Sequence, residues 1–310
     1  VDIGGQAVLE GVMMKAPDAI AISVRRPNGT IVTRRTPYVP LSKKHPWMGW
    51  PIVRGIVNFV TMLSMGMSVL QQSTDMLGML DEEPSKFEKW LSQKLGKGID
   101  KIVMAVAIVL AVILSIGLFF VIPELFARLL KVWMLGSSSN WLINLLSGIL
   151  RILILIGYIL FCAKVPDVRR TFEYHGAEHK TIFCYERGEA LTVENVRKQP
   201  RHHPRCGTSF LFVVIVVSIL LSSVLFAFVH VTNTFARMGL HILLLPVIVS
   251  ITYELNRLVG KYDNAFTRIV SAPGLWLQNW TTFEPDDSMI EVGIRAFTLV
   301  LPEEKGKDEW

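Results

Sequence analysis

Two long runs without a charged side chain constrain this chain more than any other feature. Residues 102–123 carry no charge over 22 positions, and residues 210–229 carry none over 20. Each run is long enough to cross a hydrocarbon core of about 30 Å as a helix that rises about 1.5 Å per residue. The composition agrees, because 51% hydrophobic and only 19% charged residues argue against two soluble domains. The sequence therefore predicts an integral membrane protein.

Two weaker runs complete a set of about four predicted spans. Residues 141–161 carry Arg151 at their middle, where a charge costs several kcal/mol unless it is shielded, and residues 239–256 are bounded by His241 and Glu254. A further apolar stretch, 52–80, is interrupted by polar side chains. It favours an interfacial amphipathic helix or a re-entrant segment over a fifth span.

The distribution of Lys and Arg predicts the topology. Of 32 basic residues, 13 lie in 1–101, nine in 163–209 and six in 255–310, whereas 124–140 holds two and 231–239 holds one. Because cytoplasmic loops are enriched in Lys and Arg, we expect both termini and the 163–209 loop to be cytoplasmic. A multi-pass protein in the plasma membrane, in contact with the lipid bilayer, follows from this pattern.

The soluble parts indicate a small β region followed by helices. Residues 19–37 alternate apolar and polar positions around the turn 27–30, which predicts a β-hairpin, and the acids of 284–287 predict a helix start. The expected fold class is mainly α. The expected parts are an N-terminal cytoplasmic β-hairpin region (1–50), interfacial and charged helices (51–101), a four-helix transmembrane region (102–256) with a cytoplasmic His/Cys loop (163–209), and a cytoplasmic helical tail (257–310).

The cytoplasmic loop contains an H-x-x-E-H pattern made by His175, Glu178 and His179. On a helix, His175 and His179 lie one turn apart on the same face and can hold one Zn²⁺ through their ring nitrogens. Glu178 is near enough to polarise a water at the site. This order is the inverse of H-E-x-x-H and is used by inverzincin metallopeptidases. The alternative is a pair of polar helix residues that hydrogen-bond to neighbours or water.

A second polar cluster, residues 201–208, ends the same loop just before a predicted span. Both clusters are therefore held near one membrane surface and can meet. If His175, His179, His203 and Cys206 all bind a metal, the site is closed and structural. If only three protein ligands bind, the fourth position stays open and hydrolysis becomes possible.

Three further points about the site follow from residue type. Glu254, near the cytoplasmic end of the last span, is a candidate third ligand, or else forms an ion pair with Arg257 or Arg151. Arg205 is a candidate for stabilising developing negative charge. Cysteine with histidine prefers Zn²⁺, although another divalent metal such as iron or manganese is open if carboxylates replace Cys206.

Four motifs stand in order along nearly the whole chain. They are Gly4-Gly5-Gln6-Ala7-Val8-Leu9-Glu10-Gly11-Val12-Met13-Met14, Tyr174-His175-Gly176-Ala177-Glu178-His179-Lys180, His203-Pro204-Arg205-Cys206-Gly207-Thr208-Ser209 and the 274–287 segment, which contains Gly274-Leu275-Trp276-Leu277-Gln278, Thr281-Thr282 and Glu284-Pro285-Asp286-Asp287. Together these motifs resemble the YqhQ family of bacterial membrane proteins. The resemblance implies a domain of unknown function that carries the general label of predicted metal-dependent enzyme. It supports His175, Glu178, His179, His203 and Cys206 as important positions and names no substrate.

Two classes of function remain open from the sequence. The leading hypothesis is a membrane-integrated metal-dependent enzyme that hydrolyses a peptide or lipid-linked bond at the cytoplasmic membrane face, with Glu178 as general base. The alternative is a non-enzymatic transport, insertion or scaffolding factor with a structural metal site or a polar cluster. The sequence leaves open whether the N-terminal hairpin recruits a protein partner. It also leaves open whether the protein forms a homo-oligomer. Basic residues are interleaved with acids beside the spans, so no nucleic-acid partner is expected.

Overall fold

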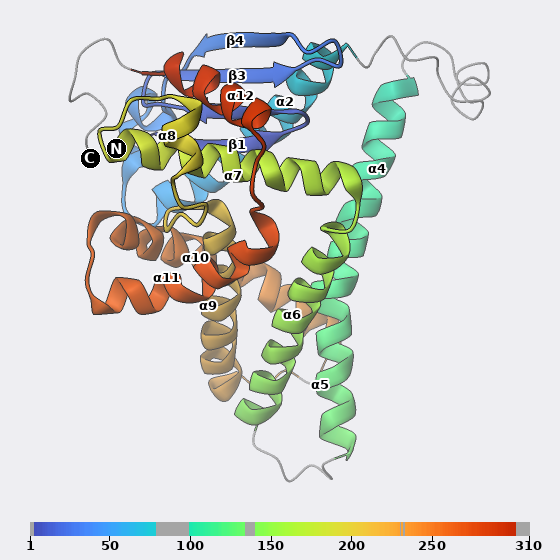
Figure 1. Ribbon diagram of the computed structural model, residues 1–310. Helices are drawn as coiled ribbons and strands as arrows, with labels where there is room; N and C mark the ends of the chain where they lie inside the picture. The colour runs from blue at the N-terminus through green and yellow to red at the C-terminus, as the bar shows by residue number, and fades with distance from the viewer. Residues whose placement is uncertain (1–2, 79–98, 134–139, 230, 232, 302–310) are drawn as a thin grey trace. The chain divides into compact units, whose positions relative to one another are not determined.

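The computed structural model describes residues 3–78, 99–133, 140–229, 231 and 233–301, and Figure 1 traces the chain by colour. The chain forms two compact units. The first, here named the sheet unit, comprises Val1–Met79, Ile156–Val217 and Leu245–Trp310, and the second, the helical unit, comprises Leu80–Leu155 and Ser218–Leu244.

A four-stranded antiparallel sheet begins the sheet unit. Its strands are hydrogen-bonded in chain order: β1 (Gly4–Val8), β2 (Gly11–Lys15), β3 (Ala19–Arg25) and β4 (Ile31–Pro37). The predicted hairpin is confirmed as β3 and β4, whose register pairs Arg25 with Ile31 across the turn. Gly29 lies in that turn at φ +84°, a left-handed conformation that glycine adopts readily because it lacks a Cβ.

Helices cover both faces of this sheet. Because successive side chains of a strand point to opposite faces, Met14 and Met13 of β2 enter different cores. Helices α7 (Pro166–Glu186) and α12 (Asp287–Thr298) pack on the Met14 face, and helix α2 (Val53–Leu77) packs on the Met13 face. The sheet is therefore the middle of three layers.

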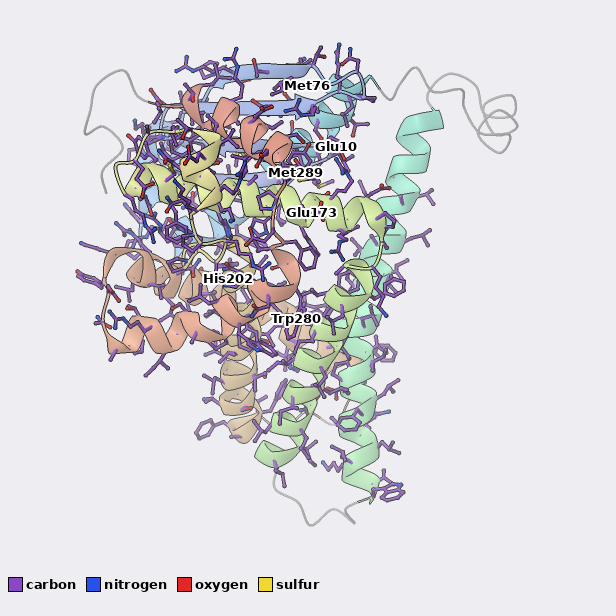
Figure 2. The ribbon with its side chains drawn as sticks, viewed as in Figure 1. Glu10, Met76, Glu173, His202, Trp280 and Met289 are labelled. Atoms are coloured by element: carbon purple, nitrogen blue, oxygen red, sulfur yellow. The ribbon has the colours of Figure 1, made fainter. Side chains whose placement is uncertain are left out.

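Helix α12 begins where the acids of the tail predict a helix start. The Asp286 carboxylate accepts a 2.9 Å hydrogen bond from the Met289 backbone N–H and so caps the helix. Met289, Ile290 and Phe297 are buried in one core with Tyr174 of α7; Figure 2 labels Met289. The apolar spacing of α12 thus ties the tail to the sheet and to α7.

Five described helices are long and apolar enough to cross a membrane. Four coincide with the predicted spans, and the fifth is α2. Helix α2 continues without interruption through the polar residues of 52–80, from which the sequence predicts an interfacial or re-entrant segment. Asn, Gln and Asp lower helix stability only by fractions of a kcal/mol, so they do not interrupt it. The predicted count of about four is not confirmed. The candidate spans are Val53–Leu77, Ala105–Trp133, Leu142–Cys162, Gly207–Phe228 and Phe235–Lys261, the pattern of a multi-pass membrane protein.

The remaining elements connect these helices. Interfacial and charged helices are predicted within residues 51–101. The first part of this range forms α2, and residues 79–98, which hold most of the charged stretch, lie outside the described part of the chain. The other elements are α1 (Leu41–Lys44), the 3₁₀ turn η1 (Pro46–Gly49), α4 (Ile99–Ile116), the π-helical turn η3 (Gly117–Val121), α5 (Ile122–Trp133), α6 (Asn140–Cys162), α8 (Val193–Arg197), α9 (Gly207–Phe228), α10 (Thr234–Lys261) and α11 (Ala265–Thr281).

Gly176 allows α7 to touch the segment that leads into α12. A Cβ built at Gly176 would lie 2.0 Å from the Phe283 carbonyl oxygen, whereas one built at Gly157 in α6 meets no atom within 4 Å. We expect Gly176→Ala to lower the free energy of unfolding by about 1–3 kcal/mol, because α7 has to shift. Thermal unfolding in detergent, with Gly157→Ala as control, tests this, and an equal midpoint for both variants would contradict it.

Candidate metal centre

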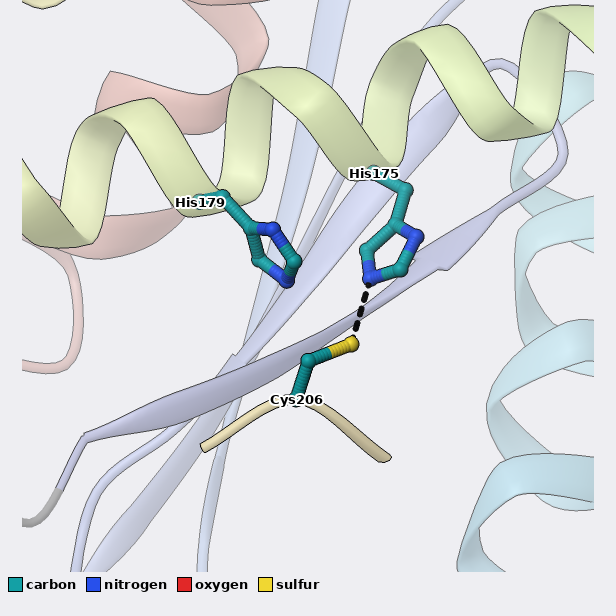
Figure 3. A group of neighbouring side chains, drawn as sticks. All are labelled: His175, His179 and Cys206. Atoms are coloured by element: carbon teal, nitrogen blue, oxygen red, sulfur yellow. Dashed lines mark hydrogen bonds between the residues drawn. The ribbon is translucent and has the colours of Figure 1, made fainter. Parts of the chain in front are cut away.

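Helix α7 carries the two histidines of the H-x-x-E-H pattern on one face. The helix starts at Pro166, where a missing N–H costs nothing, and it continues for 21 residues. The His175 and His179 rings are therefore neighbours, with centroids 4.3 Å apart. Figure 3 shows both side chains pointing from α7 toward Cys206. The helical spacing expected from the sequence is confirmed.

Cys206 completes the cluster from the turn just before α9. Its Sγ lies 3.1 Å from Nε2 of His175, the contact drawn as a dashed line in Figure 3. Donor atoms of His175, His179 and Cys206 all lie within 4.8 Å of one another, and His179 and Cys206 are buried. Two imidazoles and one sulfur thus converge on a single point.

Backbone carbonyls orient the two imidazoles. Nδ1 of His175 lies 2.8 Å from the Thr281 carbonyl oxygen, and Nδ1 of His179 lies 2.6 Å from that of Arg201. A carbonyl only accepts, so each Nδ1 carries the proton and donates it. Nε2 of each ring is then left for the cluster, which is the arrangement typical of metal-binding histidines.

Gln278 of α11 fixes the loop that carries Cys206. Its side chain is fully buried, and it accepts a 2.8 Å hydrogen bond from the His203 backbone N–H while its amide donates to the His203 carbonyl at 2.8 Å. The same amide also donates to Ser209 Oγ at 3.1 Å. Sequence reasoning gave Gln278 no role, and its place in the 274–287 motif is the only signal that points to it.

Glu178 is buried beside the cluster and against β1. A Cβ at Gly5 would lie 2.8 Å from the Glu178 carboxyl carbon, so only glycine allows this approach. Burial raises the pKa of Glu178 to about 8, with the charge of His175 and the Gly5 backbone hydrogen bond acting in the opposite direction. Its Oε2 atom has no hydrogen-bond partner among the described residues. A buried carboxyl oxygen without a hydrogen bond therefore lies beside the cluster.

The cluster also perturbs the titration of its own members. Burial lowers the pKa of His175, but the neighbouring Cys206 sulfur outweighs this and the net shift is upward. Burial raises the pKa of Cys206, and the two histidines reverse this and hold it well below the usual range. Burial and the His175 charge both lower the pKa of His179. The lowered pKa of Cys206 favours the thiolate, the form that binds metals.

The predicted site residues His203 and Arg205 lie near the cluster, but both contact Glu186. The His203 ring centroid is 5.6 Å from that of His179, yet its Nε2 is 3.5 Å from Glu186 Oε2. Burial lowers the pKa of His203 to about 4, so the ring is neutral. Arg205 forms an ion pair with Glu186. His203 and Arg205 thus line the surroundings of the site, outside the group of three donors.

Glu254 lies apart from the cluster. Its carboxylate pairs with the Arg54 guanidinium of α2, at 2.6 Å to Nε and 2.5 Å to Nη2. The ion pair that the sequence offers as the alternative role is therefore present, although its partner is neither Arg257 nor Arg151. The Arg54 guanidinium thus engages both oxygens of Glu254, which is not among the three clustered donors.

The donor set fits a tetrahedral divalent metal. Zn–S bonds of about 2.3 Å and Zn–N bonds of about 2.0–2.1 Å separate sulfur from nitrogen by roughly 3.5 Å. The observed separation of 3.1 Å between Cys206 Sγ and His175 Nε2 needs only a small side-chain movement. One thiolate and two imidazoles match the ligand preference of Zn²⁺.

All four motifs of the sequence meet at this point. Gly5 of β1 contacts Glu178 of α7, and the end of α11 binds both His175 and the turn before α9. Glu10, which Figure 2 labels, holds the β1–β2 turn on α7 by accepting hydrogen bonds of 2.5 and 2.6 Å from Arg170 and one of 3.2 Å from Tyr174. Segments far apart in sequence therefore build one site.

These features define the chain as a multi-pass membrane protein with a buried His/Cys cluster in its sheet unit. The chain belongs to the family described as "Protein of unknown function (DUF1385)", whose model matches residues 50–303. It is 33% identical over 301 residues to "Uncharacterized protein YqhQ" of Bacillus subtilis (strain 168), with 96% of this chain and 92% of that protein covered. No solved structure matches. The resemblance to the YqhQ family is confirmed.

The raised pKa of Glu178 predicts a pH-dependent stability of the metal-free protein. Between the usual glutamate pKa of 4.5 and about 8, the folded state keeps a proton that the unfolded state releases. The free energy of unfolding of the wild type should therefore fall as pH rises through this window. We expect Glu178→Gln to remove this slope, so that its stability relative to the wild type increases from pH 5 to pH 8.

The measurement is thermal unfolding in detergent with a chelator at several pH values. Glu173→Gln, a change at a glutamate of the same helix that lies in an ion pair with Arg169, is the control and should keep the wild-type slope. Parallel curves for the wild type and Glu178→Gln would show that the Glu178 carboxyl does not titrate in this range.

Proposed function

We propose that this protein is a metal-dependent hydrolase that acts beside the membrane surface. One observation carries the proposal: Cys206 Sγ and the ring nitrogens of His175 and His179 converge within 4.8 Å, while each Nδ1 is already committed to a carbonyl. Three protein donors leave one position of a tetrahedron for water or substrate, as in catalytic zinc sites. When bound, a divalent metal supplies a Lewis acid that activates water or polarises the bond to be cleaved.

Glu178 is the proposed general base. In its ionised form the carboxylate can accept a proton from an attacking water at the unpartnered Oε2, and a pKa of about 8 in the metal-free protein lets it hold that proton near neutral pH. A divalent cation bound beside it would favour the ionised form that starts the reaction. The same carboxyl can then return the proton to the leaving group. Gly5 positions the carboxylate by allowing β1 to approach it.

The place of Cys206 supports a substrate close to the bilayer. Cys206 directly precedes the candidate span Gly207–Phe228. The site is therefore attached to one end of a membrane helix, and a peptide or lipid-linked bond near the headgroups would reach it with little chain extension. We propose this class of substrate on that ground.

We also propose that four of the five candidate helices cross the membrane, with α2 at its surface. The sheet, α7 and α12 share one buried core, so all three lie on the same side. The chain must then cross an even number of times between β4 and α7. Three candidates, α2, the α4–α5 segment and α6, lie in that interval, and the sequence of residues 79–98 is too charged to add another.

Helix α2 is the candidate that fits a surface position. Val69, Met76 and Leu77 of α2 are buried against the sheet, which a spanning helix could not achieve along its last two turns. The opposite side of α2 exposes large apolar side chains at helical spacing. This face suits contact with lipid and comprises Val60, Leu63 and Met67.

A second candidate function, a transport, insertion or scaffolding factor, rests on a separate observation. The His203 ring lies beside that of His179, and with a rotated side chain it would supply a fourth ligand. A closed site of three histidines and one cysteine would then be structural, clamping the loop onto α7. Ligand number decides between the two functions.

Metal content is the first test. We expect purified wild-type protein to hold about one Zn²⁺ per chain, and His175→Ala or Cys206→Ala to lose it because each removes one of three donors. His203→Ala is the discriminating variant and should retain the metal, since His203 faces Glu186. Elemental analysis after purification without chelators measures this. Loss in His203→Ala would favour the closed structural site, and a metal-free wild type that does not take up added Zn²⁺ would contradict the metal centre itself.

Turnover is the second test. We expect Glu178→Gln to keep the metal and to lower hydrolysis by about 10²–10⁴-fold, because it removes the proton acceptor but leaves all three donors. Fluorescent casein and bis-p-nitrophenyl phosphate in detergent are suitable probes, with Glu173→Gln as control. Equal rates for Glu178→Gln and the wild type would exclude the role of general base.

Membrane sidedness is the third test. Single cysteines placed at the exposed positions Asn28, Lys198 and Glu291 should all react with an impermeant maleimide from the cytoplasmic side, because the sheet, α8 and α12 share one core. Lys131→Cys, near the end of α5, should react only from the opposite side. Labelling of Asn28→Cys and Lys198→Cys from different sides would show that α2 crosses the membrane.

A further inference from the structure

A group of buried polar side chains lies inside the helical unit, separate from the candidate metal centre. The group, here named the polar cluster, comprises Glu124 of α5, Asn144 and Arg151 of α6, and Arg237 and His241 of α10. Glu124, Asn144, Arg151 and His241 are each 9% exposed or less. All five lie within candidate membrane spans, where ionisable side chains are costly and mark functional sites.

The members of the polar cluster contact one another across three helices. Arg237 Nε lies 3.2 Å from Glu124 Oε2, and Arg237 Nη2 donates to Asn144 Oδ1. The Arg237 carbonyl oxygen is 3.1 Å from His241 Nδ1, which must donate to it. His241 Nε2 is then the lone-pair nitrogen and accepts from Arg151 Nη2 at 3.4 Å. This pairing requires a neutral His241 ring.

The charges of the polar cluster do not balance. Arginine stays protonated in proteins, so Arg151 and Arg237 contribute two positive charges, and Glu124 contributes one negative charge. Two minus one leaves a net charge of +1 on the described residues of the cluster. A lone guanidinium among membrane helices is expected to recruit an anion.

The unpaired polar atoms are all of one type. Among the described residues of the helical unit, the buried side-chain atoms without a hydrogen bond are Arg151 Nε, Asn144 Nδ2 and Arg237 Nε. Arg237 Nε is close enough to Glu124 Oε2 for an ion pair, but the contact does not have the geometry of a hydrogen bond. All three atoms are donors. These three donors can be satisfied by acceptor oxygens, and the described residues of the cluster lack one negative charge.

We propose that the polar cluster is a binding site for an oxyanion of the phosphate type. Such a group supplies several acceptor oxygens and the missing charge, and guanidinium groups bind it in a planar, two-pronged geometry. The anion is either the phosphodiester headgroup of an acidic lipid or free phosphate. A cation is disfavoured by the net charge of +1. This inference does not depend on the proposed hydrolase, because the two sites share no residue.

The test uses the full-length protein in a neutral detergent. Native mass spectrometry measures bound phosphatidylglycerol against phosphatidylcholine, and the unfolding midpoint is followed with inorganic phosphate against sodium chloride at equal ionic strength. We expect the wild type to bind phosphatidylglycerol in preference, or to be stabilised by phosphate beyond the chloride control. The first result identifies a lipid headgroup and the second a free anion.

Arg151→Gln and Arg128→Gln form a matched pair. Gln at position 151 can still donate to His241 but carries no charge, whereas Arg128 is an exposed arginine on α5 outside the cluster. We expect Arg151→Gln to weaken binding about tenfold or more and Arg128→Gln to leave it unchanged. Equal binding by the wild type and Arg151→Gln would overturn the proposal.

Asn144→Asp keeps the proposal testable even if Arg151→Gln does not fold. Asp would still accept from Arg237 and would add the missing negative charge beside it. We expect this variant to have a higher unfolding midpoint than the wild type without added anion, and to lose the response to phosphatidylglycerol or phosphate. An Asn144→Asp protein that responds like the wild type, or a wild type that responds to neither anion, would refute the site.

Discussion

The sheet unit depends on a single constraint, which is the burial of a polar helix. Helix α7 carries Glu178, His179, Lys180 and Thr181 in consecutive positions, and all four are buried. Most buried polar groups in folded proteins are hydrogen-bonded, because an unpaired one is costly. Lys180 therefore reaches the Arg197 carbonyl at 2.9 Å and Glu284 at 2.6 Å, while both histidines donate to carbonyls of flanking segments. The loop before α9 and the end of α11 are placed by these bonds.

The same constraint fixes the direction of the donor atoms in the cluster. An imidazole whose Nδ1 is held by a carbonyl cannot rotate freely, so its Nε2 keeps one direction before any ligand arrives. Gln278 holds the turn that carries Cys206 through its hydrogen bond to His203, and the missing side chain of Gly5 lets β1 approach the Glu178 carboxyl. The three donors, the Glu178 carboxyl and the residues that support them thus come from four segments, and none of these segments forms the cluster alone. That interdependence accounts for four separated motifs in one chain.

Local features could be read from the sequence because they depend on neighbouring residues. The hairpin at 19–37, the helix start at Asp286 and the one-turn spacing of His175 and His179 follow from turn chemistry, capping and helical period. The contact partners of individual side chains could not be read from the sequence. Glu254 was equally suited by residue type to a metal and to an arginine, and only the approach of α2 brings Arg54 to it. The polar residues of 52–80 likewise gave no measure of how far α2 would run.

The sequence by itself determined the membrane character of the chain, its apolar helices and the residue types that can bind a metal, because these depend on composition and short-range periodicity. Only the tertiary structure decided that Cys206 joins the two histidines, that His203 faces Glu186, and that Gln278 and Gly5 support the site. The physical reason is the distance along the chain over which each effect acts. Hydropathy and helical spacing act over a few residues, whereas a hydrogen bond between positions 175 and 281 exists only once the core has brought them together.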